Sequence, residues 1–386
     1  MRFRLILALG VLALAVRPVT AAVLPDERAD VLYHSYDGGG VEVTGPSLLV
    51  RKEFGQSVSA YANYYVDSVS SASVDVVTTA SAYEEERTET SFGVDYLRDK
   101  TVMSLSHTTS EETDYEASST HINIGQDVFG DLTTISLGYS TGSDDVFRNI
   151  KVGSTRVRDP TFTRQIDRQQ YRLGVSQIFT KNLIVSMNFE SIADEGYLNN
   201  PYRTVRYLDG TSPTGFSYES EVYPNTRSSD ALALRGRYFL AHRAAVYGEY
   251  RVYDDTWGIE ANTYEIGYVH PFRDRWVFEV RYRHYDQSAA DFYSDLFPYQ
   301  NEQNFLARDK ELSTFTSQTI GFTVSYELAS AGWKVLDKVS FTLSLDHIEF
   351  DYQDFRDLTQ LTGTPGTEPF HSFAADVLQL YVSIWF

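Results

Sequence analysis

The last residues of the chain, Asp376–Phe386, alternate strictly between two kinds of side chain. In a β-strand, neighbouring side chains point to opposite faces, so a period of two places one set on each face. One face of this segment is wholly apolar, and its members are Leu378, Leu380, Val382, Ile384 and Phe386. The segment is typical of the closing strand of a membrane β-barrel, with apolar groups outward and polar groups inward. An edge strand of a water-soluble sheet is the alternative.

The first 22 residues are typical of a secretory signal peptide. Arg2 and Arg4 precede an apolar run over residues 5–16, and the small residues near position 22 suit cleavage. The run is shorter than the roughly 20 residues that a membrane-spanning helix needs, and no longer run follows it. We therefore expect a signal peptide over residues 1–22 and one exported barrel domain over residues 23–386. The lack of cysteine excludes disulfides, a lipid-anchored cysteine and covalent c-type haem.

A period of two recurs along most of the remaining sequence, and no comparable stretch keeps the helical period of 3.6. Tight connections and long polar segments alternate between these runs. The tight connections fall at residues 54–56, 98–100, 129–131, 180–182, 241–243, 272–275 and 329–336. The long polar segments fall at residues 67–82, 145–163, 195–226, 287–308 and 351–372. We expect an all-β chain without a substantial helix after the signal peptide.

Seven tight turns imply seven hairpins, and residues 30–36 supply a partner for the closing strand. The sequence therefore predicts a transmembrane antiparallel β-barrel of about 16 strands, within a range of about 14–18, with short periplasmic turns and long extracellular loops. A barrel of this size leaves an aqueous lumen. An even strand number places both termini on the periplasmic side of the outer membrane of a Gram-negative bacterium.

Acidic side chains gather beside the long polar segments, as at residues 84–86, 111–114 and 254–255. The net charge is −20, and it becomes −23 without the signal peptide, which carries three arginines and no acids. This charge excludes nucleic acid as a partner, because nucleic acid requires a basic surface. Acids around a pore mouth favour cations, whereas solvated loop charges without a role are the alternative.

Charged residues also fall on the polar faces of several predicted strands. They predict a ladder of opposite charges on the lumen wall, made of Arg235, Arg237, Glu249, Arg251, Glu265, Glu279, Arg281 and Arg283. Such a ladder braces the wall and sets ion selectivity, and a substrate site is the alternative.

The segment 67–82 is rich in small and β-branched residues. It suits a loop folded inward, with Asp67 and Asp75 facing the pore, or else a compact external loop or a strand extension.

Patterns of catalysis and metal binding do not stand out in the sequence. Ser106 and His107 are adjacent, so in a strand they point to opposite faces and do not form a nucleophile–base pair. The eight histidines show no ligand spacing, and Gly38–Gly40 has no following helix to cradle phosphate. We expect no enzymatic activity, catalytic residue, metal or cofactor.

Four stretches together resemble the Gram-negative family called domain of unknown function 3570. They are Ala29–His34, Tyr36–Gly40, Asn63–Asp67 with the following Ser68–Ser81, and Asp194–Tyr207 with its central Asn199–Arg203. The resemblance runs over essentially the whole mature chain and implies an outer-membrane barrel without an established activity. Family members are often encoded beside a small lipoprotein and flavin-transfer or thioredoxin-like proteins. The resemblance therefore also implies a small lipoprotein or redox partner.

These observations predict an outer-membrane channel or transport barrel with a polar lumen. A structural barrel that holds a periplasmic lipoprotein or redox partner, without free conduction, is the alternative. Either form contacts outer-membrane lipid. Either form also meets the barrel-assembly machinery, whose recognition signal the alternating C-terminal face and the terminal Phe386 resemble.

Overall fold

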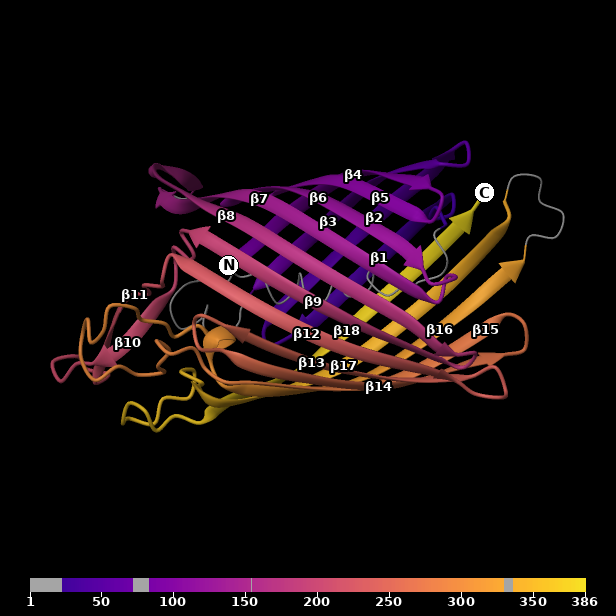
Figure 1. Cartoon of the computed structure of the whole chain (residues 1–386). Helices are drawn as coiled ribbons and strands as arrows, with labels where there is room; N and C mark the ends of the chain where they lie inside the picture. The colour runs from indigo at the N-terminus through magenta and orange to yellow at the C-terminus, as the bar shows by residue number, and fades with distance from the viewer. Residues whose placement is uncertain (1–22, 72–82, 154, 330–335) are drawn as a thin grey trace.

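The computed structural model describes residues 23–71, 83–153, 155–329 and 336–386 of the chain. Sixteen antiparallel strands close into one barrel, and two short strands form a separate hairpin, β10–β11, between β9 and β12 (Figure 1). The strands are β1 (Arg28–Gly38), β2 (Val41–Phe54), β3 (Val58–Ser71), β4 (Tyr83–Arg98), β5 (Thr101–Glu111), β6 (Tyr115–Val128), β7 (Thr133–Val152), β8 (Thr155–Thr180), β9 (Leu183–Gly196), β10 (Thr204–Leu208), β11 (Phe216–Ser220), β12 (Thr226–Phe239), β13 (Ala245–Asp255), β14 (Glu260–Phe272), β15 (Trp276–Gln287), β16 (Phe315–Ala329), β17 (Lys338–Arg356) and β18 (Phe370–Trp385).

Strand β1 pairs with β18 along the whole length of β1 and so closes the barrel. Arg28 lies opposite Trp385, and Gly38 lies opposite Ala375. The predicted strand over residues 30–36 is therefore β1, and the predicted closure and strand number are confirmed. Because Arg28 also lies opposite Arg51, close to the β2–β3 turn, β1 starts and β18 finishes at the short-turn end, on the right in Figure 1.

The seven predicted tight turns all join neighbouring strands. Positive φ angles at Asp99, Gly130, Arg243 and Arg273 let the chain reverse within a few residues. Within the described ranges, the one helical element is a three-residue 3₁₀ turn, η1 (Lys310–Leu312), as the lack of a helical period predicts. None of the helices in the described part of the chain is long and apolar enough to cross a membrane.

One predicted long loop is wrong, because residues 145–152 belong to β7 and residues 155–163 belong to β8. These strands stay paired as far as Val152 opposite Thr155, beyond the last residues that pair with β6 and β9. A register shift after Phe147 lets the hairpin continue past the barrel wall. Polar residues made this segment look like a loop, yet cross-strand pairs such as Ile150–Val157 extend the sheet.

The predicted inward loop at 67–82 starts later than the sequence indicates. Residues 67–71 continue β3, and Asp67 lies opposite Arg87 of β4. The rest of that segment, with Asp75, lies outside the described residues, so an inward fold stays a prediction.

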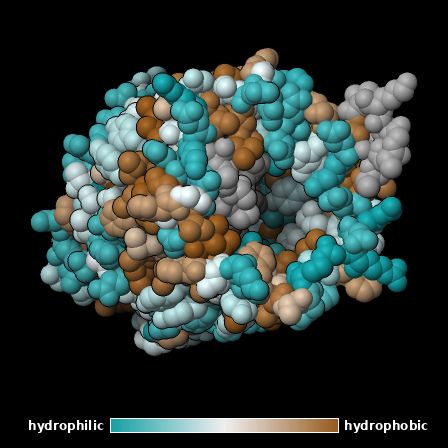
Figure 2. Space-filling model, turned by 45° about the vertical axis from the view of Figure 1, so that its right-hand side comes forward, coloured by the Kyte–Doolittle hydropathy of each residue, from teal (hydrophilic) through white to brown (hydrophobic). Residues whose placement is uncertain are grey.

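The outer face of the wall is apolar on every strand. Each of the sixteen barrel strands exposes at least one large apolar side chain, for example Leu48, Leu105, Leu234, Ile266 and Ile320. Figure 2 shows apolar residues gathered over the outer wall and hydrophilic residues toward the short-turn end on the right. A continuous apolar belt is costly in water and matches a hydrocarbon layer. The chain therefore has the fold of an outer-membrane barrel, as predicted, and the soluble edge-strand alternative is wrong.

Candidate functional site: the lumen wall and the long-loop mouth

Inward-facing glycines let long side chains bond across an intervening strand. Gly321 of β16 separates Arg281 of β15 from Asp346 of β17, and Arg281 donates to Asp346 over it. A Cβ on Gly321 would lie 2.6 Å from Cγ of Arg281 and would also collide with the Asp346 carboxylate. Tyr247 of β13 likewise reaches over Gly267 of β14. Its hydroxyl donates to Glu279 of β15 at 2.7 Å.

The strand register places every residue of the predicted charge ladder on the inner face. Arg235 of β12 lies 3.8 Å from Glu249 and 3.9 Å from Glu265. Arg251 lies 3.9 Å from Glu190 of β9, a residue that sequence reasoning missed. Among the described residues, ion pairs between members of the predicted ladder are therefore those of Arg235 alone, and a role of the ladder as a constriction stays a prediction.

Two ladder arginines differ from the prediction. Arg237 and Arg283 form no ion pair with the described carboxylates, and the Arg237 guanidinium instead lies 5.6 Å from the Tyr247 ring centre. Arg281 pairs with Asp346, which is not a member of the predicted ladder. Asp346 was missed because its partner lies two strands away, and cross-strand counting considers only direct neighbours.

Asp67 is a buried wall residue. Its Oδ1 lies 2.7 Å from Nε2 of His34 on β1, and the Tyr65 ring stacks on that imidazole with centroids 5.1 Å apart. The guanidinium of Arg87 approaches the other carboxylate oxygen to 3.9 Å. These contacts hold Asp67 inside the barrel but in the wall, so it is not a loop acid that projects into the pore.

The interior also presents polar side chains to solvent. Arg172 of β8 is 54% exposed on the inner face, where it lies 3.0 Å from Glu190. Asn123 of β6 and Asn188 of β9 point inward beside it and are also exposed. Exposed polar groups on the inner face of a closed wall indicate a lumen that water can enter.

Three long connections pack together at the other end of the barrel, and we call them the cap: residues 197–225, 288–314 and 357–369. Val222 and Leu306 exchange two backbone hydrogen bonds of 2.9 and 2.7 Å. Phe297 donates its backbone N–H to Arg206 and is almost fully buried beside Val205. Because backbone and apolar contacts join these segments, they form one folded unit at the long-loop end (Figure 1, left).

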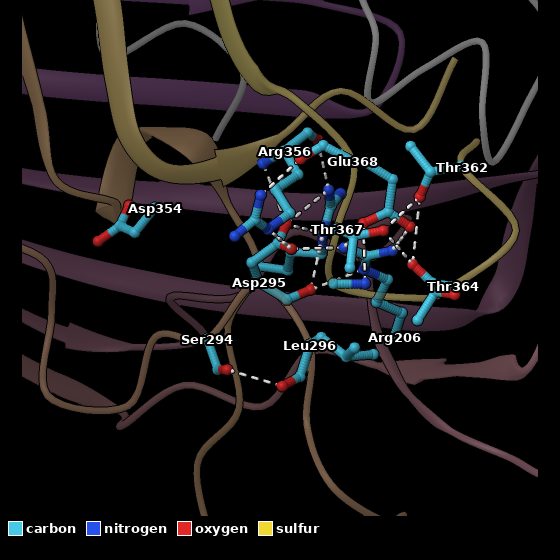
Figure 3. A network of polar contacts seen from close by, with 12 residues as sticks. Arg206, Ser294, Asp295, Leu296, Asp354, Arg356, Thr362, Thr364, Thr367 and Glu368 are labelled. Carbon is cyan, nitrogen blue, oxygen red and sulfur yellow. Dashed lines mark hydrogen bonds and ion pairs between the residues drawn. The ribbon is translucent and has the colours of Figure 1, made fainter. Parts of the chain in front are cut away.

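A cluster of charges holds the cap together, and we call it the latch: Arg206, Asp295, Arg308, Arg356 and Glu368, of which all but the half-buried Arg356 are buried. Figure 3 labels Arg206, Asp295, Arg356 and Glu368. Arg206 is fully buried and donates to Glu368 at 2.8 Å and to Asp295 at 2.5 Å. Arg308 donates to Asp295 at 3.0 Å, and Arg356 donates to the Glu368 carbonyl at 2.5 Å. Each of the three connections supplies at least one member.

One carboxylate of the latch has a lowered pKa. Burial raises the pKa of Glu368, but the hydrogen bonds and positive charge of Arg206 together with backbone N–H donors outweigh burial and bring that pKa below its usual value. The latch has no signature in the sequence, because Arg206 and Glu368 are 162 residues apart in two different loops.

The cap contains a second buried polar group, which is centred on Glu221. The Glu221 carboxylate accepts from the Tyr223 hydroxyl at 2.5 Å and from the Arg308 backbone N–H at 2.8 Å. Burial, with the nearby Asp309 carboxylate, raises the pKa of Glu221 to about 7. Asp309 itself pairs with Arg203 at 2.7 Å. Glu221 therefore changes its charge near neutral pH.

Three acids also meet beside the β5–β6 turn. Carboxylate oxygens of Glu85, Glu112 and Asp114 lie within 4.8 Å of one another. Burial, then the neighbouring Glu85, raises the pKa of Glu112 to about 7. From the sequence, these acids are expected to be part of an acidic long-loop rim or solvated loop charges, without a metal. Their geometry is that of a possible donor set for a hard cation, but it assigns no function by itself.

Comparison with solved structures finds other barrels. One is described as a bacterial polysaccharide outer membrane secretin, with a TM-score of 0.49, 7% identity, and coverage of 94% of this chain and 99% of that one. A loop-deletion mutant of OmpT, an outer membrane protein of Vibrio cholerae, has a TM-score of 0.42 and 9% identity over 94% and 98% of the two chains. The outer membrane protein opdK of Pseudomonas aeruginosa has a TM-score of 0.42 and 9% identity over 93% and 99%.

A search among curated proteins finds no significant match. A family model, by contrast, matches residues 76–344, which is well over half of the chain. Its description is "Protein of unknown function (DUF3570)". The matched region contains the predicted stretch Asp194–Tyr207, whereas the stretches at 29–40 and 63–67 lie before it. The chain thus belongs to the DUF3570 family of proteins of unknown function, as its sequence resemblance predicts.

Proposed function

We propose that this protein is a channel or transport barrel of the outer membrane whose long-loop mouth is closed by the cap. In the proposed orientation, the short turns and both termini are periplasmic and the cap faces outward, which is the usual asymmetry of such barrels. Outer-membrane lipid and the barrel-assembly machinery are its proposed partners.

The exposed polar side chains of the inner wall carry this proposal. Arg172, Asn123 and Asn188 are exposed on the inner face of a closed barrel, which supports a hydrated path beside β6–β9. A barrel with only a bracing role has no need for solvent-exposed charge in its interior. The ladder of Arg235, Glu249 and Glu265 would then line the same path and act on passing ions.

The cap supports regulated rather than free conduction. Arg206 makes its bonds only while all three connections are packed together, so opening one of them breaks the latch. The same cap also fits the second candidate, a barrel that holds a periplasmic lipoprotein or redox partner at the short-turn end. In that case the mouth would stay closed.

Conductance in a planar bilayer tests the proposal. We expect rare, small conductance steps from the wild-type protein and larger or longer openings from Arg206→Gln, whose cap is loosened. Heat-shifted migration on a detergent gel controls for an intact barrel, because closed barrels satisfy every backbone group and resist detergent. If both folded proteins fail to conduct while a small lipoprotein co-purifies from native membranes, the partner-holding barrel is favoured instead.

A further inference from the structure

The short-turn rim of β12–β15 carries a local excess of positive charge. His242 and Arg243 lie in the β12–β13 turn, and Arg273–Arg275 form the β14–β15 turn. Arg243 contacts Asp274 at 3.5 Å, with side chains 72% and 94% exposed, so the two turns lie side by side. Among the described residues, no carboxylate pairs with Arg273 or Arg275. Of the three guanidinium groups, only that of Arg243 has a carboxylate partner among the described residues.

Three other basic side chains at the same end of the barrel have carboxylate partners, whereas Arg98 and Lys181 form no ion pair with the described carboxylates. Lys52 pairs with Glu27 at 2.8 Å, Lys100 with Asp131 at 2.6 Å, and Lys338 with Glu327 at 3.1 Å. Ion pairing is thus available to rim cations in this chain. Arg273 and Arg275 form no such ion pair with the described carboxylates, so their guanidinium groups are available to bind an external anion.

Outward-facing aromatic rings border these arginines on the lipid side. Arg275 donates to the Tyr326 hydroxyl at 3.3 Å, and Arg273 lies 5.1 Å from the Phe272 ring centre. The rings of Trp276 and Tyr326 are 4.6 Å apart, and both belong to the outer face. Aromatic girdles sit at the depth of lipid headgroups, so the guanidinium groups lie at that depth too.

Two histidines complete the cluster. The Tyr268 hydroxyl is 2.9 Å from Nδ1 of His270 and 3.5 Å from Nε2 of His242. The two imidazole centroids are 6.0 Å apart. Tyr268 thereby joins the β12–β13 turn to the outer face of β14. We call Arg243, Arg273, Arg275, His242 and His270 the rim cluster.

We propose that the rim cluster binds the phosphate of an anionic glycerophospholipid in the leaflet at the short-turn end. Guanidinium groups match phosphate oxygens in geometry as well as in charge, and basic residues at a membrane interface attract anionic lipid. The exposed apolar wall above the rim, which includes Ile266 and Val280, offers a surface for the acyl chains. A free phosphate ester shares the headgroup chemistry but has no chains to lie there. This site goes beyond the proposed function and does not depend on conduction.

Lipid retention by the purified full chain tests the site. The probes are phosphatidylglycerol and phosphatidylcholine in mixed detergent micelles, with bound lipid counted by native mass spectrometry. We expect the wild-type protein to prefer phosphatidylglycerol. The variant Arg273→Gln/Arg275→Gln should bind it roughly tenfold or more weakly, because each lost cation near the headgroups weakens the attraction severalfold. Arg98→Gln/Lys100→Gln, on another part of the same rim, should change binding less than about twofold.

Two results would overturn the proposal. One is an equal loss of phosphatidylglycerol in both double variants, since binding would then depend on total rim charge and not on this cluster. The other is displacement of the lipid by glycerol phosphate at comparable concentration, which would indicate a soluble-anion site without a role for acyl chains. Heat-shifted gel migration of each variant checks that the barrel is intact, and single Arg273→Gln replaces a double variant that fails it.

Discussion

At the scale of single residues, the inner wall depends on positions that have no side chain. Gly321 and Gly267 leave room for Arg281 and Tyr247 to cross a strand and reach their partners. A sequence pattern of alternating polar residues predicts which side chains face inward, but it does not reveal that a glycine between them is required. That requirement depends on packing between three strands, which sequence periodicity does not encode.

Gly321→Ala should destabilise the barrel, because the new methyl group displaces the Arg281–Asp346 pair. Overpacking of this kind costs about 1–3 kcal/mol. The matched control is Gly125→Ala, where nothing lies within 4 Å of the added Cβ and the strand loses a flexible residue. Urea unfolding followed by the gel shift measures both. Equal midpoints for the two variants would mean that the pair does not need the space above Gly321.

Glu221 should make the cap sensitive to pH. Its pKa in the fold is raised to about 7, so the ionised form is the disfavoured one. The cap is therefore most stable below the usual glutamate pKa of about 4.5 and loses stability as the pH rises through about 7. We expect the cap to be cut faster by protease at pH 8 than at pH 5.5, relative to an unstructured substrate at each pH.

The control for this prediction is Glu221→Gln, which keeps an acceptor for Tyr223 and for the Arg308 backbone N–H but has no titrating proton. Its normalised cleavage rate should change less between the two pH values than that of the wild type. The part that remains belongs to Glu311, whose pKa burial and the nearby Asp309 also raise to about 7. A pH dependence as large as that of the wild type would show that Glu221 is not the group responsible.

At the scale of elements, local patterns predicted the strands better than the loops. The seven turns and the alternating faces were found because each depends on neighbours in sequence. The β7–β8 extension was missed because its polar residues, Asp159-Pro160 among them, are typical of a loop, whereas its pairing depends on the opposite strand. The cap was missed for a related reason: Arg206, Asp295 and Glu368 meet only once distant segments have folded.

The C-terminal strand should tolerate changes on its inner face better than on its outer face. Tyr381 faces inward near Arg281 and Asp346, whereas Phe386 continues the outer face, where Lys52 lies 5.4 Å from its ring centre. Phe386→Asp places a charge at the lipid face and alters the proposed assembly signal, at a cost of up to a few kcal/mol. We expect less assembled protein from Phe386→Asp than from Tyr381→Ala in membrane fractions. Similar levels would contradict the assignment of faces.

The latch should hold the cap without holding the barrel. Arg206→Ala leaves Asp295 and Glu368 buried with one partner fewer, and loss of one member of a buried ion pair costs about 3–5 kcal/mol. We expect faster proteolysis within residues 197–225, 288–314 and 357–369, with unchanged heat-shifted migration. Lys100→Ala removes an exposed ion pair and should leave both measurements unchanged, since such pairs contribute little. Loss of the gel shift in Arg206→Ala would show that the cap supports the wall as well.

At the scale of the whole molecule, the sequence was informative because a barrel repeats one simple rule. Every strand must be apolar outward, and every backbone group must bond to a neighbouring strand, so alternation and turn spacing together predict the architecture. No comparable rule relates the sequence of a barrel to its function. The ladder residues were placed on the correct face, yet whether they narrow the path depends on loops and on pairings such as Arg281–Asp346 that no periodicity specifies.

Ion selectivity depends on single residues, on the long loops and on the net charge of the whole molecule. The mature chain carries a net charge of −23, and acids outnumber bases around the long-loop mouth. Most ladder arginines are neutralised by partners, but Arg237 and Arg283 have none among the described carboxylates, and they oppose the field of the mouth. We expect the field of the mouth acids to outweigh that of these two arginines, so the channel should prefer cations at low salt. Arg237→Gln/Arg283→Gln should strengthen that preference.

Reversal potentials across a salt gradient measure this preference directly. The preference should fade as salt rises, because the Debye length falls from about 30 Å at 0.01 M to about 3 Å at 1 M, so distant rim charges are screened before close ones. Wild-type anion preference that Arg237→Gln/Arg283→Gln abolishes would place the narrowest point at these arginines and contradict the expectation. A preference that is unchanged from 0.01 M to 1 M would also contradict it, because only charges in direct contact with the ion escape screening, and the mouth acids are not among them.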